Sequence, residues 1–214
     1  MALVPVLNRR QWLAAAGALS ATAFATPAAA GEGEQNAASA HRRWPVTSSG
    51  ADIQASPLPG QPGRDYTPVM VPGGHVLPWK VVDGVKVYHL VAEEVAHEFA
   101  PGLKADCWGY NGGVHGPLIE AVEGDRVRVY VTNRLPAPTT VHWHGVFLDN
   151  GMDGVGGITQ PIIKPGETFL YEWTFRQHGT FMYHPHHDEM TQMAMGMMGL
   201  IVVHPRGEPP TGRA

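Results

Sequence analysis

The chain has 214 residues, a formal net charge of -4 at pH 7 and charged side chains at only 16% of its positions. This length suits one domain with a core large enough to be stable, and the absence of a basic patch argues against a nucleic-acid partner. The 26 glycines and 19 prolines favour short strands joined by turns. Cys107 is the only cysteine, so an intrachain disulfide is excluded.

The first 30 residues have the pattern of an export signal. Arg9-Arg10 directly precedes an apolar, alanine-rich run that ends in Ala28-Ala29-Ala30, a small-x-small cleavage pattern. The alternative is a membrane-spanning helix, but the run is weakly apolar and Pro27 lies in it, so no stable membrane span is expected. We therefore predict a Tat-like signal peptide over residues 1–30 and a periplasmic or secreted protein. Residues 31–66 are polar and rich in Ala, Pro and Gly, which predicts a flexible lead.

The next part of the chain shows the alternation of β-strands. From Val85 to Val95, valines recur at odd-numbered positions, which is the two-residue period of a strand. Pro101-Gly102 ends this segment. The turn signal Gly124-Asp125 precedes a strand that turns three valines inward, namely Val127, Val129 and Val131. Further strands are predicted at residues 139–144, 169–175, 179–184 and 199–203, and one short helix near residues 189–198. Strands at this spacing indicate a β-sandwich or a barrel. The predicted domain spans residues 67–205, and residues 206–214 form a linker-like tail.

Two His-x-His pairs are the candidate metal site. His142 and His144 form the first pair, and His184 and His186 form the second. Alternate residues of a strand share one face, so the two imidazoles of each pair point the same way. Four convergent imidazoles suit a borderline metal such as copper or zinc. A structural zinc site is the alternative, and the affinity order of divalent metals favours copper.

The methionines that follow the second pair allow two interpretations. Thioethers bind Cu(I), but Met190, Met193 and Met197 have helical spacing, which favours packing against the core. Met195 and Met198 are the better candidates for exposed thioethers. For the lone thiol of Cys107 we expect a buried or half-buried position.

Several motifs occur in an order that resembles a known family. They lie at residues 108–112, 124–127, 140–145 (Thr-Val-His-Trp-His-Gly), 152–155, 179–186 and 188–199. Together they are similar to the first, plastocyanin-like cupredoxin domain of a bacterial multicopper oxidase, over about residues 68 to 205. The resemblance implies an all-β Greek-key cupredoxin sandwich with one short Met-rich helix.

The resemblance also implies roles for individual residues. His142 matches a ligand of type 2 copper, and His144, His184 and His186 match ligands of the type 3 copper pair. Asp153 matches a carboxylate that delivers protons during oxygen reduction, although an Asp-Gly pair is also an ordinary turn. The family's cluster takes eight imidazoles, and this chain supplies four. A blue, type 1 copper site needs a thiolate beside histidines, and the sequence contains no His-Cys-His, so no type 1 site is expected.

Two functions remain open from the sequence. The first is copper-ion binding as the first-domain half of the trinuclear cluster of an oxidase, which oxidises a phenol or a metal ion and reduces dioxygen to water. A second cupredoxin domain or chain would supply the missing ligands, and the isolated chain would not be catalytically complete. The alternative is a non-catalytic periplasmic copper-binding or copper-handling module, favoured by the missing half of the site and the methionine run.

Overall fold

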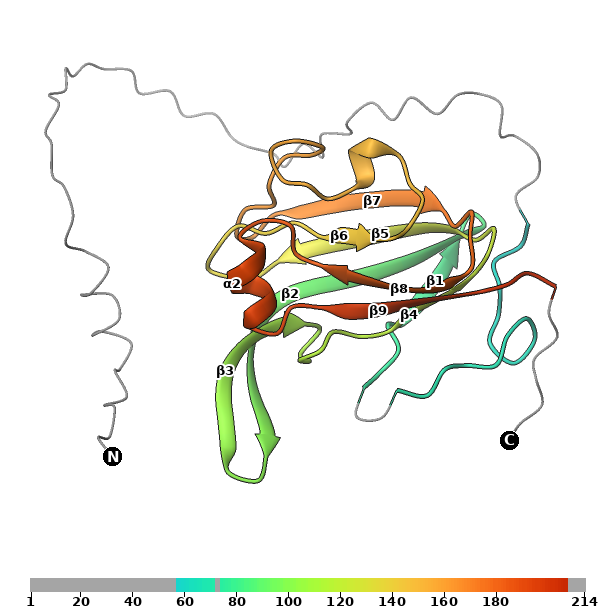
Figure 1. The fold of residues 1–214 in the computed structure, drawn as a ribbon. Coiled ribbons are helices and arrows are strands. Elements are labelled where there is room, and N and C mark those ends of the chain that lie inside the picture. Colours follow the sequence, from blue (N-terminus) through green and yellow to red (C-terminus); the bar gives the residue numbers. More distant parts are fainter. Residues whose placement is uncertain (1–56, 72–73, 208–214) are drawn as a thin grey trace, which may run out of the picture. The chain divides into compact units, whose positions relative to one another are not determined.

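The structure is a computed structural model that describes residues 57–71 and 74–207. The predicted signal peptide, most of the predicted lead and most of the predicted tail lie outside the described residues. The described chain forms two β-sheets, one short helix and one 3-10 turn (Figure 1). In chain order the elements are β1 (Trp79–Val82), β2 (Val85–Ala100), β3 (Leu103–Tyr110), β4 (Ile119–Val122), β5 (Arg126–Asn133), β6 (His142–His144), η1 (Asn150–Met152), β7 (Thr168–Thr174), β8 (Gly179–His184), α2 (Glu189–Ala194) and β9 (Gly199–His204).

The first sheet has five strands, in the order β1-β2-β5-β7, with β3 also paired to β2. The long strand β2 has two environments, because its first half lies between β1 and β5 while its second half pairs only with β3. The β2–β3 hairpin extends beyond the other strands of the sheet (Figure 1). Gly102 closes it with a φ of 81°, a conformation that favours glycine.

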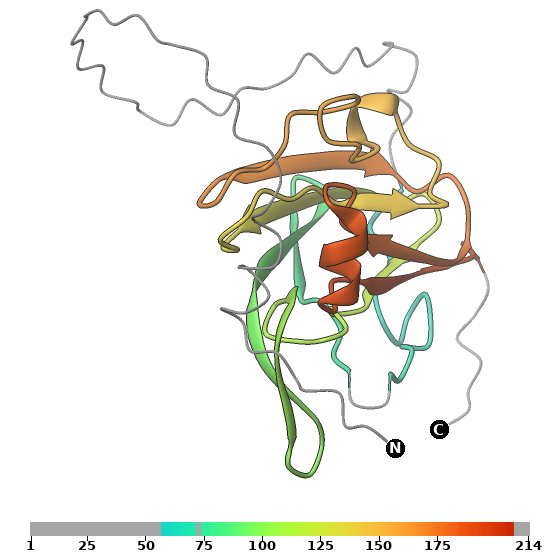
Figure 2. The ribbon, with the colours of Figure 1, turned by 60° about the vertical axis from the view of Figure 1, so that its left-hand side comes forward.

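The second sheet has the order β4-β9-β8-β6. Only β8 and β9 are consecutive strands, and between β4 and β8 the chain crosses repeatedly between the two sheets, as in a Greek key. Helix α2 lies between β8 and β9 in the sequence and beside the strands of this sheet (Figure 2). The all-β sandwich with one short helix, expected from the sequence, is therefore confirmed.

The core lies between the sheets and follows from the alternation of the strands. The three valines predicted to face inward on β5 are all 0% exposed. Large aromatic side chains complete the core, and Trp143 of β6, Tyr171 of β7 and Tyr183 of β8 are also fully buried. Because β-branched and aromatic side chains pack well on a pleated surface, this pattern favours strands over helices.

The sequence did not identify the inner face of strand β2. Its core face consists of the even-numbered residues Tyr88, Leu90 and Ala92, all at most 1% exposed, whereas His89 on the other face is exposed. Apolar residues occur on both faces of this strand, so the alternation alone did not identify the inner face. Strands β1, β3 and β4 were not predicted, because β1 and β4 are short and β3 lacks a regular alternation of apolar and polar residues.

The packed region begins before the predicted boundary at residue 67. Tyr66 is 4% exposed and stacks on His204, with ring centroids 4.4 Å apart. His204 is the last residue of β9, and its Nε2 lies 2.7 Å from Glu120 Oε1. The last residues of the predicted lead therefore pack on the domain and are not a free segment.

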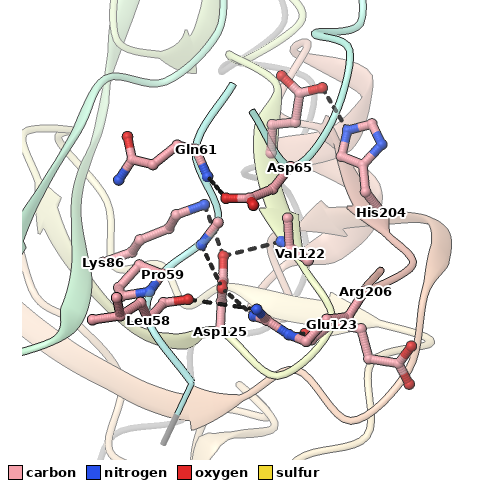
Figure 3. A network of polar contacts seen from close by, with 12 residues as sticks. Leu58, Pro59, Gln61, Asp65, Lys86, Val122, Glu123, Asp125, His204 and Arg206 are labelled. Atoms are coloured by element: carbon pink, nitrogen blue, oxygen red, sulfur yellow. Dashed lines mark hydrogen bonds and ion pairs between the residues drawn. The ribbon is translucent and has the colours of Figure 1, made fainter. Parts of the chain in front are cut away.

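A buried carboxylate, Asp125, joins several parts of the chain at this end of the domain (Figure 3). Its Oδ1 accepts hydrogen bonds from the Gly60 amide at 2.9 Å and from Arg206 Nη2 at 2.9 Å. Its Oδ2 accepts from the Val122 amide at 3.0 Å and pairs with Lys86 Nζ at 2.7 Å. Both Asp125 and Lys86 are 0% exposed. We call these five residues the Asp125 network; its charges are tolerated inside the protein because each one is paired.

Candidate metal centre

The first histidine pair lies on β6, a strand of only three residues. The central residue, Trp143, is 0% exposed and packs in the core against Tyr171 and Trp173, with ring centroids 5.1 and 4.8 Å away. Because successive side chains of a strand alternate, His142 and His144 both face away from the core. The packing of the tryptophan therefore sets the direction of both imidazoles.

The second pair is brought to the first by the pairing of β6 with β8. The antiparallel register places His142 opposite His184 and Trp143 opposite Tyr183. His142, His144 and His184 each offer one ring nitrogen such that all three nitrogens lie within 4.8 Å of one another. We call these residues the three-histidine cluster.

Hydrogen bonds define which nitrogens of the cluster can bind a metal. His142 Nδ1 donates to the carbonyl oxygen of Asp153 at 2.6 Å, and His184 Nδ1 donates to the carbonyl oxygen of Pro185 at 2.9 Å. Because a carbonyl oxygen only accepts, both rings keep a lone pair on Nε2. His144 Nδ1 lies 3.2 Å from His184 Nε2. Because Nε2 of His184 has the lone pair, His144 Nδ1 is the donor of this hydrogen bond in the metal-free chain. A metal ion shared by these two nitrogens would replace this proton.

Burial favours the metal-binding form of His184. Its side chain is only 4% exposed. Removal from water lowers the pKa of His184, against the smaller opposing effects of the Pro185 carbonyl and the Glu189 carboxylate. The ring is therefore neutral at neutral pH, which is the form that coordinates a metal.

His186, the fourth predicted ligand, lies at the rim of the cluster. Its ring centroid is 5.3 Å from that of His142 and 6.4 Å from that of His184, and its side chain is 37% exposed. It is not one of the three residues whose nitrogens lie within 4.8 Å of one another. The physical reason is that β8 ends at His184, so the strand alternation that aligns His142 with His144 does not extend through Pro185 to His186.

Asp153 lies beside the first pair, as expected. Its Oδ1 is 3.4 Å from His142 Nδ1, in addition to the hydrogen bond from that nitrogen to its carbonyl oxygen. The Asp-Gly turn is also present, because Gly154 has a φ of 87° and a Cβ added there would lie 1.9 Å from the Val141 carbonyl oxygen. The two interpretations of this residue are thus compatible.

Two residues of helix α2 were missed by the sequence reasoning. Glu189 Oε1 lies 3.6 Å from His184 Nδ1, and Glu189 Oε2 lies 4.0 Å from His186 Nε2. Gln192 is 1% exposed and bonded to the segment that precedes β6. A glutamate three residues after a histidine, at the start of a predicted helix, was the available signal.

The methionines and the cysteine give a mixed result. Met197 is 0% exposed, as expected for packing, but Met190 is 88% exposed, so its predicted packing is wrong. Helix α2 has only six residues and presents Met190 to solvent, while Met197 lies beyond the helix. Cys107 is 7% exposed on β3, opposite Val95, which confirms the expected buried thiol. It belongs to the five-stranded sheet, whereas the cluster belongs to the other sheet.

The donor set of the cluster fits copper. Three imidazoles, of which one is nearly buried, converge without a thiolate, and imidazole nitrogen suits copper and zinc alike. The carbonyl of Asp153 and the carbonyl of Pro185 hold the rings in the tautomer that a metal requires. The geometry thus supports a metal centre built on β6 and β8.

A comparison with protein families decides between the candidate classes of protein. Residues 92–208, more than half of the chain, match the family model described as "Multicopper oxidase". The chain belongs to the multicopper oxidase family. The copper resistance protein A of Pseudomonas syringae pv. tomato is 38% identical over 109 residues, which are 51% of this chain and 18% of that protein. A laccase of Pestalotiopsis fici is 44% identical over 98 residues, or 44% of this chain and 16% of that protein.

A solved structure supports the same assignment. The crystal structure of a multicopper oxidase from Pseudomonas thermotolerans is similar with a TM-score of 0.56 and 39% identity, over 57% of this chain and 30% of that one. This likeness confirms the cupredoxin type of sandwich. The chain spans less than a third of the length of each of these three relatives. Among the residues that the structure describes, no helix has the length and apolar character to cross a membrane.

Proposed function

We propose that this chain is the first-domain half of the trinuclear copper cluster of a multicopper oxidase. The observation that supports it is the three-histidine cluster, in which ring nitrogens from two paired strands lie within 4.8 Å of one another. In this proposal His142 binds type 2 copper, and His144, His184 and His186 bind the type 3 pair. Copper, when bound, would supply the redox chemistry that reduces dioxygen to water.

The residues around the cluster have distinct tasks in this proposal. The carbonyls of Asp153 and Pro185 keep the Nδ1 protons of His142 and His184, so that Nε2 of each ring remains free. The Asp153 side chain is 35% exposed and its Oδ1 lies 3.4 Å from His142 Nδ1. It therefore contacts both solvent and the cluster, and its carboxylate can take up a proton from solvent and hold it beside His142.

The rest of the site has to come from a second cupredoxin domain or chain. His144 is exposed and His186 is partly exposed, so the cluster is open to a partner on this side. The partner would contribute the other four imidazoles and the type 1 site, and its surface would select the reducing substrate, a phenol or a metal ion. We place the assembled oxidase in the periplasm or outside the cell, after Tat-like export of the folded domain.

Copper stoichiometry tests this proposal directly. We expect the purified chain to bind copper, and the double variant with His144→Ala and His184→Ala to bind none at the same site. The copper-loaded chain should lack the intense blue absorption of a copper–thiolate bond, and it should not turn over a laccase substrate by itself. Failure of the unmodified chain to bind copper would reject the proposal.

A second candidate function is a copper-handling module without catalysis. It is favoured by the 88% exposure of Met190, on the helix that follows the second histidine pair, and by the relative that is named a copper resistance protein. The two functions are distinguished by mixing the chain with a co-expressed cupredoxin that has the missing imidazoles and a Cys ligand. Oxidase activity that appears only in the mixture supports the first function, and bound copper without activity supports the second.

A further inference from the structure

Helix α2 is fixed to the segment that leads into β6, the strand with the first histidine pair. Gln192 Nε2 donates to the Pro138 carbonyl at 2.8 Å, and Gln192 Oε1 accepts from Thr139 Oγ1 at 2.7 Å. Gln192 is 1% exposed, and Thr139 is 0% exposed. Because buried hydrogen bonds are costly to break, this contact fixes α2 relative to the segment that enters β6.

The start of the helix is also constrained. Asp188 precedes α2 in the left-handed conformation, with a φ of 46° and a ψ of 50°, and its Oδ1 accepts from Thr191 Oγ1 at 2.9 Å. Aspartate is one of the few residues besides glycine that adopt this conformation, and the hydrogen bond from Thr191 helps to hold it here. The turn makes α2 begin three residues after His186, so the helix has little freedom to move away from the second histidine pair.

This anchoring determines where the carboxylate of Glu189 lies. Glu189 precedes Gln192 by three residues, so the two residues share one side of the helix. The Glu189 carboxylate contacts both histidines of the second pair, since Oε1 lies 3.6 Å from His184 Nδ1 and Oε2 lies 4.0 Å from His186 Nε2. Asp153 has the equivalent place beside the first pair.

We propose that Glu189 is the positioning residue of the second histidine pair, an inference that rests on the copper-binding function proposed above. Its negative charge lies on the Nδ1 side of His184 and stabilises the proton there, which leaves Nε2 free to coordinate. The Pro185 carbonyl accepts that proton at 2.9 Å, and the carboxylate adds charge at 3.6 Å and increases the basicity of the ring. The same carboxylate restrains the partly exposed ring of His186.

The test compares Glu189→Gln, Glu189→Asp and a matched control in copper titrations of the purified chain. The control is Glu98→Gln, because Glu98 has a side-chain exposure of 45% against 44% for Glu189 and also faces a basic side chain, Lys104. Glutamine keeps the shape of Glu189 and removes its charge. We expect Glu189→Gln to weaken Cu(II) binding by about 10-fold to 100-fold, the usual effect of losing a carboxylate behind a ligand imidazole.

The copper EPR spectrum and the thermal unfolding midpoint provide independent readouts. We expect Glu189→Gln to change the EPR hyperfine splitting, Glu189→Asp to recover part of the affinity, and Glu98→Gln to match the unmodified chain. The inference would be overturned if Glu189→Gln left both the copper affinity and the EPR spectrum unchanged. A lower thermal unfolding midpoint in that case would show only a structural role of Glu189 at the helix start. If the unmodified chain itself binds no copper, the proposed function and this inference both fail.

Discussion

The Asp125 network and the three-histidine cluster use polar side chains in opposite ways. Each oxygen of Asp125 accepts two contacts, and its charge is balanced by Lys86 and Arg206. In the cluster, the contact between His144 and His184 is a single hydrogen bond of 3.2 Å, and His144 remains exposed. Both oxygens of Asp125 are occupied, so this carboxylate cannot bind a ligand, whereas a cluster held by one replaceable proton can.

This difference predicts where each substitution will have its effect. A change in the Asp125 network should reduce the stability of the fold, because it leaves buried charge without a partner. A change at the exposed histidine of the cluster, His144, should remove metal affinity and leave the fold almost unaffected. The predictions below test this division, from the largest expected effect to the smallest.

The largest loss of stability is expected from Asp125→Ala. Burial lowers the pKa of Lys86, and Asp125 is the main group that opposes this effect. Removing the carboxylate leaves a buried cation unpaired, which typically costs about 3–5 kcal/mol of unfolding free energy. Urea denaturation measures this loss, with Glu98→Gln as an exposed control. A loss below about 1 kcal/mol would show that the network is not a source of stability.

The largest loss of metal affinity is expected from His144→Ala. The residue is exposed, so the unfolding free energy of the metal-free chain should change by no more than about 0.5 kcal/mol. Copper affinity should fall by more than about 100-fold, beyond the loss typical of residues that only support a ligand. His178→Ala is the matched control, because His178 is also exposed and its Nδ1 lies 3.0 Å from Glu123 Oε2. Equal copper binding by both variants would contradict imidazole ligation at the cluster.

Copper binding should also depend on pH. A protonated imidazole cannot coordinate, so occupancy should decline as the pH falls below about 6.5, the ordinary pKa of histidine. Burial lowers the pKa of His184, so this ring remains neutral to a lower pH in the folded chain than in the unfolded chain. The unfolded chain then binds more protons, and the contribution of His184 to stability above pH 6.5 is lost as the pH falls. Equilibrium dialysis at pH 5 and pH 7.5 measures the occupancy, and equal values would count against the proposal.

The smallest effect on the fold is expected from Met190→Ser. The side chain is 88% exposed, so the unfolding free energy should change by less than about 0.5 kcal/mol. Cu(I) titration with a competing chelator then separates the two candidate functions. Unchanged Cu(I) affinity removes the support that this thioether lends to a copper-handling module, and a clear loss strengthens it.

The parts of the fold that were predictable are those with strictly local causes. The alternation of valine with polar residues on β5 identified its inner face, and the His-Trp-His order placed two imidazoles on one face of a strand. In both cases the period of the strand alone determines the direction of the side chain. The same reasoning does not extend to His186, which lies beyond the end of β8, so its role as a ligand stays a prediction.

The remainder of the structure depends on contacts between distant segments. The pairing of Lys86 with Asp125 requires the parallel alignment of β2 with β5, in which Lys86 lies beside Val127. Neither charge has a sequence signal that distinguishes it from a solvent-exposed residue. Likewise, Glu189 reaches His184 only because Gln192 fixes α2 to the segment before β6. Tertiary packing, not local pattern, determines these positions.

The register of β6 against β8 links the assembly of the core to the assembly of the metal site. His142 faces His184 in the same alignment that places Trp143 opposite Tyr183 in the core. A slip of this pairing by one residue would turn the imidazoles inward and expose the aromatic rings to water. A mispaired molecule therefore loses its copper affinity and its hydrophobic interior together, so the capacity to take up copper can serve as an assay of correct folding.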